Sequence, residues 1–130
     1  MMIDTSAVSA FFQGNEAVAG YFRSADALYL NPVVIGELLA GFMLGRREKK
    51  NREALDGLLS SPRVSVIGID SETSERYATI LTYLRKNGTP IPTNDLWIAA
   101  SAMQHGLKLL TADRHYLKVP QIISTLCEMP

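Results

Sequence analysis

The sequence predicts an α/β protein with a central, mainly parallel sheet of about five strands. Three observations support this class. Short apolar or β-branched runs alternate with longer segments of helical periodicity along all 130 residues. The composition is globular, with 47% hydrophobic and 20% charged residues. No repeat, linker or low-complexity segment divides the chain, so we expect a single domain over residues 1–130.

Charge, cysteine content and hydropathy limit the possible functions. The net charge is zero, which removes a general electrostatic argument for nucleic-acid binding, although a basic patch beside an acidic site would leave the sum unchanged. The single cysteine, Cys127, cannot form an internal disulfide and fits a reducing compartment. No apolar run reaches the ~18 residues of a membrane helix, and the N-terminus lacks a signal-peptide pattern. We therefore expect a cytoplasmic protein.

The first part of the chain predicts two strands separated by helices. Residues 1–4 are too few for a helix and end at Asp4, a capping residue, which indicates a strand that leads into a helix over 7–13. A glycine break precedes a second helix over 16–24. The apolar run 27–30 is the second predicted strand.

Asn31 and Pro32 are typical of a helix start, with Asn as the N-cap and Pro as the first residue. The basic run 46–52 leads into a further helix that ends near Ser60. Such a run is more often a solvated helix face than a surface for RNA phosphates or an acidic partner. The β-branched residues of 63–69 predict the third strand.

A capping box that begins at Asp70 predicts the next helix. The helix after it starts beyond Pro92, is capped by Thr93 or Asn94, and stops at Gly106, which tolerates the left-handed cap. The remaining predicted elements are strands over 107–110 and 121–126 and one helical turn over 114–117.

Four acidic residues occupy positions that suggest a functional site. Asp4 and Asp113 follow predicted strands, Asp95 begins a helix, and Glu37 lies on a helical face of apolar or small residues. Each alone has an ordinary explanation in capping, the helix dipole, a turn or an ion pair. Because right-handed crossovers bring the carboxyl ends of parallel strands to one edge, we expect the four acids to converge there.

Converging carboxylates repel one another and raise each other's pKa unless a cation joins them. Oxygen ligands select Mg²⁺ or Mn²⁺, whereas Zn²⁺ prefers cysteine and histidine. A carboxylate-bound Mg²⁺ keeps waters, accepts phosphate oxygens and activates water for in-line attack on phosphorus. We expect Ser6, Thr111 and Asn94 to orient the ligands or their waters.

Four segments in sequence order resemble the PIN domain family and, within it, the VapC-type ribonuclease toxins of toxin–antitoxin pairs. These segments are 4–6, 34–38, 94–100 and 109–116, and the resemblance covers the whole chain. It implies a three-layer α/β/α sandwich and RNA cleavage with Mg²⁺ or Mn²⁺ held by four acids. By resemblance, Asp4, Glu37, Asp95 and Asp113 are those acids, with supporting hydroxyls from Ser6 and Thr111. It also implies a homodimer and a small antitoxin that occludes the acidic site with a basic side chain.

Three further side chains near these segments have alternative explanations. His115 could contact phosphate or assist a proton transfer, but we expect it to be a polar residue on a short surface helix. Tyr116 stands where the family frequently has Phe, a departure expected to leave the acids untouched. Trp97 and Tyr116 could stack on a base, although Trp97 is better explained by core packing or a dimer contact.

Other functions remain open from the sequence. A dehalogenase-like phosphatase would need a second Asp at the position of Ser6. A receiver-like phosphoacceptor domain could use Asp70 but needs an acidic pair near the first strand, which Thr5 does not supply. A catalytically silent PIN-like binding module would lack one of the acids. A PIN nuclease of RNA processing, outside any toxin–antitoxin pair, would keep all four.

Overall fold

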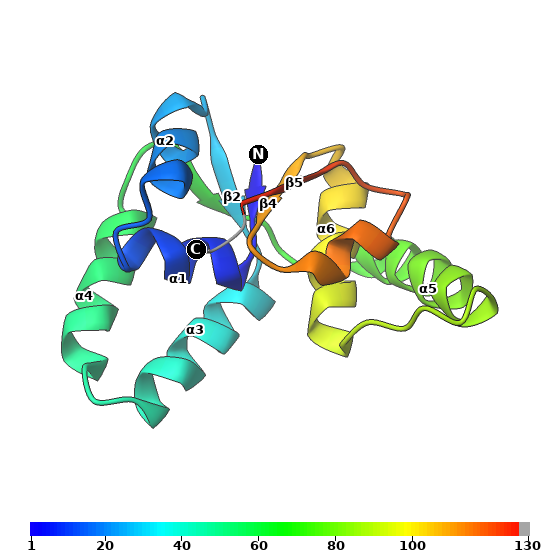
Figure 1. The fold of residues 1–130 in the computed structure, drawn as a ribbon, viewed down its shortest axis with the longest axis horizontal. Helices are drawn as coiled ribbons and strands as arrows, with labels where there is room; N and C mark the ends of the chain where they lie inside the picture. The colour runs from blue at the N-terminus through cyan, green and yellow to red at the C-terminus, as the bar shows by residue number, and fades with distance from the viewer. Residues whose placement is uncertain (128–130) are drawn as a thin grey trace.

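A five-stranded sheet runs through the centre of the structure, a computed structural model that describes residues 1–127 (Figure 1). All neighbouring strands are parallel, in the order β3-β2-β1-β4-β5. The strands are Met2–Ile3 (β1), Leu28–Leu30 (β2), Val64–Val66 (β3), Leu109–Thr111 (β4) and Ser124–Leu126 (β5). The predicted parallel sheet is confirmed, with strands shorter than the sequence indicated.

The strand order creates a crevice at the middle of the sheet. β1 and β4 lie side by side, with Met2 paired to Leu109. From β1 the chain crosses to β2 on one side, whereas from β4 it crosses to β5 on the other. Where the direction of crossover reverses, the carboxyl ends of the two strands border a ligand-binding crevice. Asp4 and Asp113 follow these two strands directly or within two residues.

Helices cover both faces of the sheet. In Figure 1, α1 to α4 lie on one side of the strands, and α5 and α6 lie on the other. Their bounds are Thr5–Phe12 (α1), Glu16–Ser24 (α2), Pro32–Leu44 (α3), Glu48–Leu59 (α4), Ser71–Lys86 (α5) and Thr93–His105 (α6), with a short 3-10 helix, η1, at Arg114–Lys118. This is the expected three-layer sandwich. Within residues 1–127, none of the helices combines the length and the apolarity needed to cross a membrane.

The central strands are buried on both faces, as expected for a parallel sheet between two helical layers. Ile3 of β1 and Leu109 and Leu110 of β4 are fully buried. From the other layer, Ile98 and Ala99 of α6 are also fully buried in the same core. This close packing fixes β1, β4 and α6 relative to one another. Asp95 lies within α6, and Asp4 and Asp113 lie just after β1 and β4.

Most predicted helix boundaries are confirmed by hydrogen bonds. The Asn31 side chain caps α3 by accepting from the Val34 amide. Asp70 and Thr73 form the predicted capping box of α5. Gly106 ends α6 in the left-handed conformation with a φ of 62°.

The predicted cap of α6 was wrong. Pro92 is the N-cap and has no side-chain hydrogen bond, so Thr93 and Asn94 already belong to the first helical turn. The reason is that an N-cap must have non-helical backbone angles, and the extended residue here is Pro92 (φ −56°, ψ 148°). The Asn94 side chain is therefore directed at Glu37 instead of at its own helix.

Candidate metal centre

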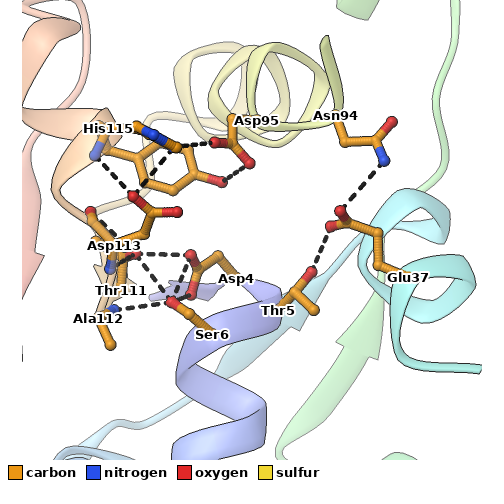
Figure 2. Close-up of polar contacts among 11 residues, drawn as sticks. Asp4, Thr5, Ser6, Glu37, Asn94, Asp95, Thr111, Ala112, Asp113 and His115 are labelled. Atoms are coloured by element: carbon orange, nitrogen blue, oxygen red, sulfur yellow. Dashed lines mark hydrogen bonds and ion pairs between the residues drawn. The ribbon is translucent and has the colours of Figure 1, made fainter. Parts of the chain in front are cut away.

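Four acids from three layers of the fold face the carboxyl edge of the sheet (Figure 2). Asp4 follows β1, Asp113 follows β4, Asp95 lies in the first turn of α6, and Glu37 lies within α3. Figure 2 shows the three aspartates clustered together, with Glu37 across from them. The three aspartates therefore converge as the sequence predicted, whereas Glu37 lies farther from them.

Asp4 is the most enclosed of the four, with 2% of the residue exposed. Its carboxylate caps α1 by accepting from the Ala7 amide at 2.8 Å. It also accepts from the Ser6 hydroxyl at 2.8 Å and from the Thr111 hydroxyl at 2.6 Å. Burial raises the pKa of Asp4 to about 6, although these three hydrogen bonds oppose the rise and Asp113 adds to it. Asp4 is thus both a helix cap and a carboxylate whose ionised form is penalised by burial.

The metal-free protein should lose the stabilisation that Asp4 provides as the pH rises from about 4 to about 6. The pKa of Asp4 is about 6 in the folded state and 3.8 for an ordinary aspartate, so folding favours the protonated form. This contribution is complete below pH 3.8 and is lost through pH 6, which amounts to about 3 kcal/mol.

Urea unfolding with a chelator, at pH 4 to 7, measures this loss. The Asp4→Asn variant cannot titrate at this position. Its free energy of unfolding relative to the wild type should therefore increase by about 2 kcal/mol across this range, because part of the loss has already occurred at pH 4. A difference that stays constant with pH would contradict the prediction.

Asp95 and Asp113 are joined by a histidine. The His115 Nδ1 atom lies 2.9 Å from Asp95 Oδ2 and 3.1 Å from Asp113 Oδ1. The same Asp113 oxygen accepts from the His115 backbone amide at 2.8 Å, since Asp113 caps η1. Burial raises the pKa of Asp95, and Asp113 raises it further, whereas the hydrogen bond from His115 lowers it. As expected from the sequence, His115 lies partly exposed on the short helix η1, but it also contacts both carboxylates, which the sequence did not predict.

Tyr116 also contacts the acids. It is 1% exposed, and its hydroxyl donates to Asp95 Oδ1 at 3.3 Å. Its pKa lies well above the ordinary range because of burial and of the nearby Asp4 and Asp95 carboxylates, so it remains a donor. The departure from Phe leaves all four acids in place, as expected, but the tyrosine hydroxyl contacts one of them. The burial of the ring argues against base stacking, which the sequence had left open. A phenylalanine at this position would lack the hydroxyl that holds Asp95.

Glu37 is tied to the aspartates through their neighbours. Thr5, the residue after Asp4, donates to Glu37 Oε1 at 2.6 Å. Asn94, the residue before Asp95, donates to Glu37 Oε2 at 3.2 Å. Both carboxylate oxygens of Glu37 are thus oriented by residues adjacent to the other acids. The contribution of Thr5 was missed from the sequence, where its position beside Asp4 was the available signal.

Two hydroxyls connect the ends of β1 and β4. Ser6 Oγ accepts from the Ala112 amide at 2.9 Å and lies 3.2 Å from Thr111 Oγ1. Thr111 Oγ1 accepts from the Asp113 amide at 2.9 Å while it donates to Asp4. The predicted supporting roles of Ser6 and Thr111 therefore match contacts in the structure, since each hydroxyl fixes an acid or the loop that carries one.

Replacing Thr111 by Val should destabilise the protein by about 2 kcal/mol. The substitution keeps the side-chain shape but removes the hydroxyl between the Asp4 carboxylate and the Asp113 amide, and Thr111 is fully buried. Thr111→Ser retains the hydroxyl and should cost less. Urea unfolding of both variants measures the order, and a Val variant as stable as the Ser variant would contradict it.

An open pocket of about 500 Å³ adjoins the cluster. It is lined by Ser6, Ser9, Ala10, Gln13, Ala112, Asp113, Arg114 and His115. Ser6, Asp113 and His115 belong to both the pocket and the cluster, so a molecule bound in the pocket would touch the cluster.

The donor set fits a divalent cation. Single ligand atoms of Asp95, Asp113 and His115 lie within 4.8 Å of one another. The raised pKa values of Asp4 and Asp95 show that burial penalises their charged forms. A cation would offset both penalties, because an opposite charge favours the ionised carboxylate.

Two remaining residues lie outside the cluster. Trp97 stacks on Tyr77 of α5, with ring centroids 4.2 Å apart, which agrees with the packing role expected from the sequence. Asp70 follows β3, the strand at the edge of the sheet, and bonds to Thr73 and Gln104. A receiver-like phosphoacceptor domain would need its acceptor aspartate beside the other acids. The position of Asp70 at the edge of the sheet therefore argues against such a domain.

The parallel sheet and the acids at the ends of its central strands define an α/β protein with an acidic cluster that could hold a metal ion. The chain belongs to the PIN domain family, whose model matches residues 1–122.

Relatives in this family are ribonucleases and toxins. The chain is 33% identical to ribonuclease VapC4 of Mycobacterium tuberculosis over 90 residues, which cover 69% of each chain. It is 31% identical to ribonuclease VapC1 of Rickettsia felis, over 85% of this chain and 83% of that protein. These similarities place the chain beside the VapC members of the family, as the sequence motifs predicted.

Solved structures agree on the fold. VapBC2 from Rickettsia felis, bound to a DNA fragment from its promoter, superposes with a TM-score of 0.84 at 23% identity, over 95% of this chain and 96% of that one. FitAcB from Neisseria gonorrhoeae gives a TM-score of 0.79 at 26% identity, over 95% of this chain and 94% of that one. The fold described above is therefore that of known PIN-type toxins.

Proposed function

We propose that this protein is a metal-dependent endoribonuclease that hydrolyses RNA phosphodiester bonds, and that it is the toxin of a VapBC-type toxin–antitoxin pair. The observation that carries the proposal is the aspartate cluster at the central crevice of the sheet. Asp4, Asp95 and Asp113 meet there, with Glu37 linked to them through Thr5 and Asn94. The ribonuclease names of the relatives support the choice of RNA as the substrate.

In this proposal the three aspartates and Glu37 would hold Mg²⁺ or Mn²⁺. The chemistry that such an ion would supply is activation of water for in-line attack on phosphorus and stabilisation of the negative charge that develops there. Thr111 keeps Asp4 aligned at the carboxyl end of β1. The buried hydroxyl of Tyr116 restrains Asp95 in the same way. Fixing the carboxylates before substrate binds reduces the reorganisation that the reaction requires.

The supporting residues orient the fourth acid. Asn94 and Thr5 each hold one oxygen of Glu37, so its carboxylate faces the aspartates across the crevice in Figure 2. The open pocket beside Asp113 offers space for a segment of RNA next to the acids. An RNA strand lying there would bring a phosphate to the cluster.

Incubation of the purified protein with single-stranded RNA tests the enzymatic part of the proposal. We expect cleavage with Mg²⁺ or Mn²⁺, none with a chelator, and recovery when the ion is restored. DNA of the same sequence is the matched substrate control. No cleavage of any RNA under these conditions would overturn the assignment as a nuclease.

The partners follow from the toxin assignment. Relatives of known structure are VapBC and FitAcB assemblies, and one is described as a toxin–antitoxin complex from Klebsiella pneumoniae. We propose that a small antitoxin occludes the acidic site with a basic side chain, and that the toxin is a cytoplasmic homodimer. A positive side chain fits this crevice because its buried carboxylates are ionised only at an energetic cost.

Expression in cells separates a toxin from a nuclease of RNA processing. Induction of the gene alone should arrest growth, and co-expression of a short neighbouring reading frame should relieve the arrest. Mapping of RNA ends after induction identifies the cleavage sites. Growth without arrest, together with cleavage in vitro, would favour RNA processing outside a toxin–antitoxin pair.

A further inference from the structure

His115 is not one of the four acids predicted to bind a metal, yet its side chain contacts two of them. Its Nδ1 atom lies between two carboxylates, at 2.9 Å from Asp95 and 3.1 Å from Asp113 (Figure 2). Its backbone amide also donates to the Asp113 carboxylate, which fixes the base of the side chain beside the cluster. The imidazole is thus held in the metal centre by two independent contacts.

The distances from His115 Nδ1 to the two carboxylate oxygens are those of adjacent ligands around one ion. Ligands at neighbouring corners of an octahedron with bonds of about 2.1 Å lie about 3 Å apart. The two distances from Nδ1 to the carboxylate oxygens match this edge length. A cation can therefore replace the proton between nitrogen and oxygen with little movement of the side chains.

We propose that His115 Nδ1 is a metal ligand beside Asp95 and Asp113, and that this nitrogen shifts the ion preference of the site from Mg²⁺ towards first-row transition ions such as Mn²⁺. The inference rests on the metal-dependent function proposed above. Mg²⁺ takes almost exclusively oxygen ligands, whereas imidazole is a good ligand for transition metals. A site with one nitrogen among its oxygens discriminates against Mg²⁺ more than a site of four carboxylates does.

The exposure of the residue allows this role. The His115 side chain is 42% exposed, so the ring has room to adjust around an ion. The Asp95 and Asp113 side chains are less exposed, at 13% and 35%. An ion that enters from the adjoining pocket would meet His115 and Asp113, both of which line it, before the more enclosed Asp95.

Electron spin resonance of Mn²⁺ bound to the protein tests the proposal directly. Spin-echo modulation should show coupling to nitrogen, and labelling with ¹⁵N-histidine should convert the ¹⁴N coupling to ¹⁵N. This labelling needs no substitution, so it remains informative even if a variant misfolds. The chain has two histidines, and His105 is exposed at the end of α6.

Matched variants identify which histidine binds. His115→Asn places an oxygen or amide near the position of Nδ1, and His105→Asn is the control. His115→Asn should lose the nitrogen coupling and lower the ratio of Mn²⁺ to Mg²⁺ affinity by about tenfold or more, whereas His105→Asn should change neither. The affinities come from Mn²⁺ titration with Mg²⁺ as the competitor, and circular dichroism checks that both variants fold.

The outcomes separate this proposal from the proposed function. Bound Mn²⁺ without histidine coupling, or an unchanged affinity ratio in His115→Asn, would overturn the role of His115 and leave the nuclease intact. Wild-type protein that neither binds Mn²⁺ nor cleaves RNA would overturn both.

Discussion

Replacing Asp95 by Asn is expected to reduce RNA cleavage by about a thousandfold while the fold is retained. Asp95 contributes a charged oxygen to the cluster and contacts both His115 and Tyr116. The amide removes the negative charge but keeps the side-chain volume. Losing roughly 4 kcal/mol of transition-state stabilisation, as expected when a metal centre loses a charged ligand, corresponds to about 10³ in rate.

The measurement is the initial rate of RNA cleavage at saturating Mn²⁺, with circular dichroism and thermal unfolding as checks on the fold. Asp56→Asn removes the same charge from the exposed face of α4 and serves as the matched control. It should cleave RNA at the wild-type rate. Wild-type cleavage by a folded Asp95→Asn variant would exclude the metal centre as the catalytic site.

A divalent cation is expected to stabilise the folded protein strongly. At about 100 times its dissociation constant, an ion that binds only the folded state adds about 2.7 kcal/mol to the free energy of unfolding. For a chain of 130 residues this corresponds to a rise in Tm of about 10 °C. The physical reason is that the ion offsets the cost of the buried Asp4 and Asp95 carboxylates.

Differential scanning fluorimetry with Mn²⁺, Mg²⁺ and a chelator measures this rise. Asp113→Asn removes the negative charge of one of the three clustered ligand residues and should reduce the shift to a few degrees, whereas Asp56→Asn should show the full shift. Equal shifts in the wild type and in Asp113→Asn would place the ion elsewhere on the protein.

The contacts that His115 and Tyr116 make with Asp95 change the expected composition of the site. A set of four acids suggests a site made only of oxygen ligands. The structure instead surrounds Asp95 with a nitrogen from His115 and a phenol from Tyr116. Both residues belong to η1, which follows directly after Asp113. This short helix therefore positions the two side chains that contact Asp95.

The sequence alone determined the architecture and indicated which acids would lie at one edge of the sheet. Alternating strands and helices required a parallel sheet, and the ends of its strands had to share one edge. This arrangement by itself predicts that Asp4 and Asp113 lie near each other. Local capping rules likewise fixed the starts of α3 and α5, because a cap depends only on residues three positions apart.

The tertiary structure decided which atoms meet. Periodicity gives the face of a helix on which a residue lies, but not the rotation and crossing angle that bring it within about 3 Å of a residue on another element. For this reason the sequence did not predict that Thr5 holds one carboxylate oxygen of Glu37 while Asn94 holds the other. For the same reason the sequence did not predict that the partly exposed His115 contacts both Asp95 and Asp113. Hydrogen bonds and metal ligands require agreement within a few tenths of an ångström, and only the packed core supplies it.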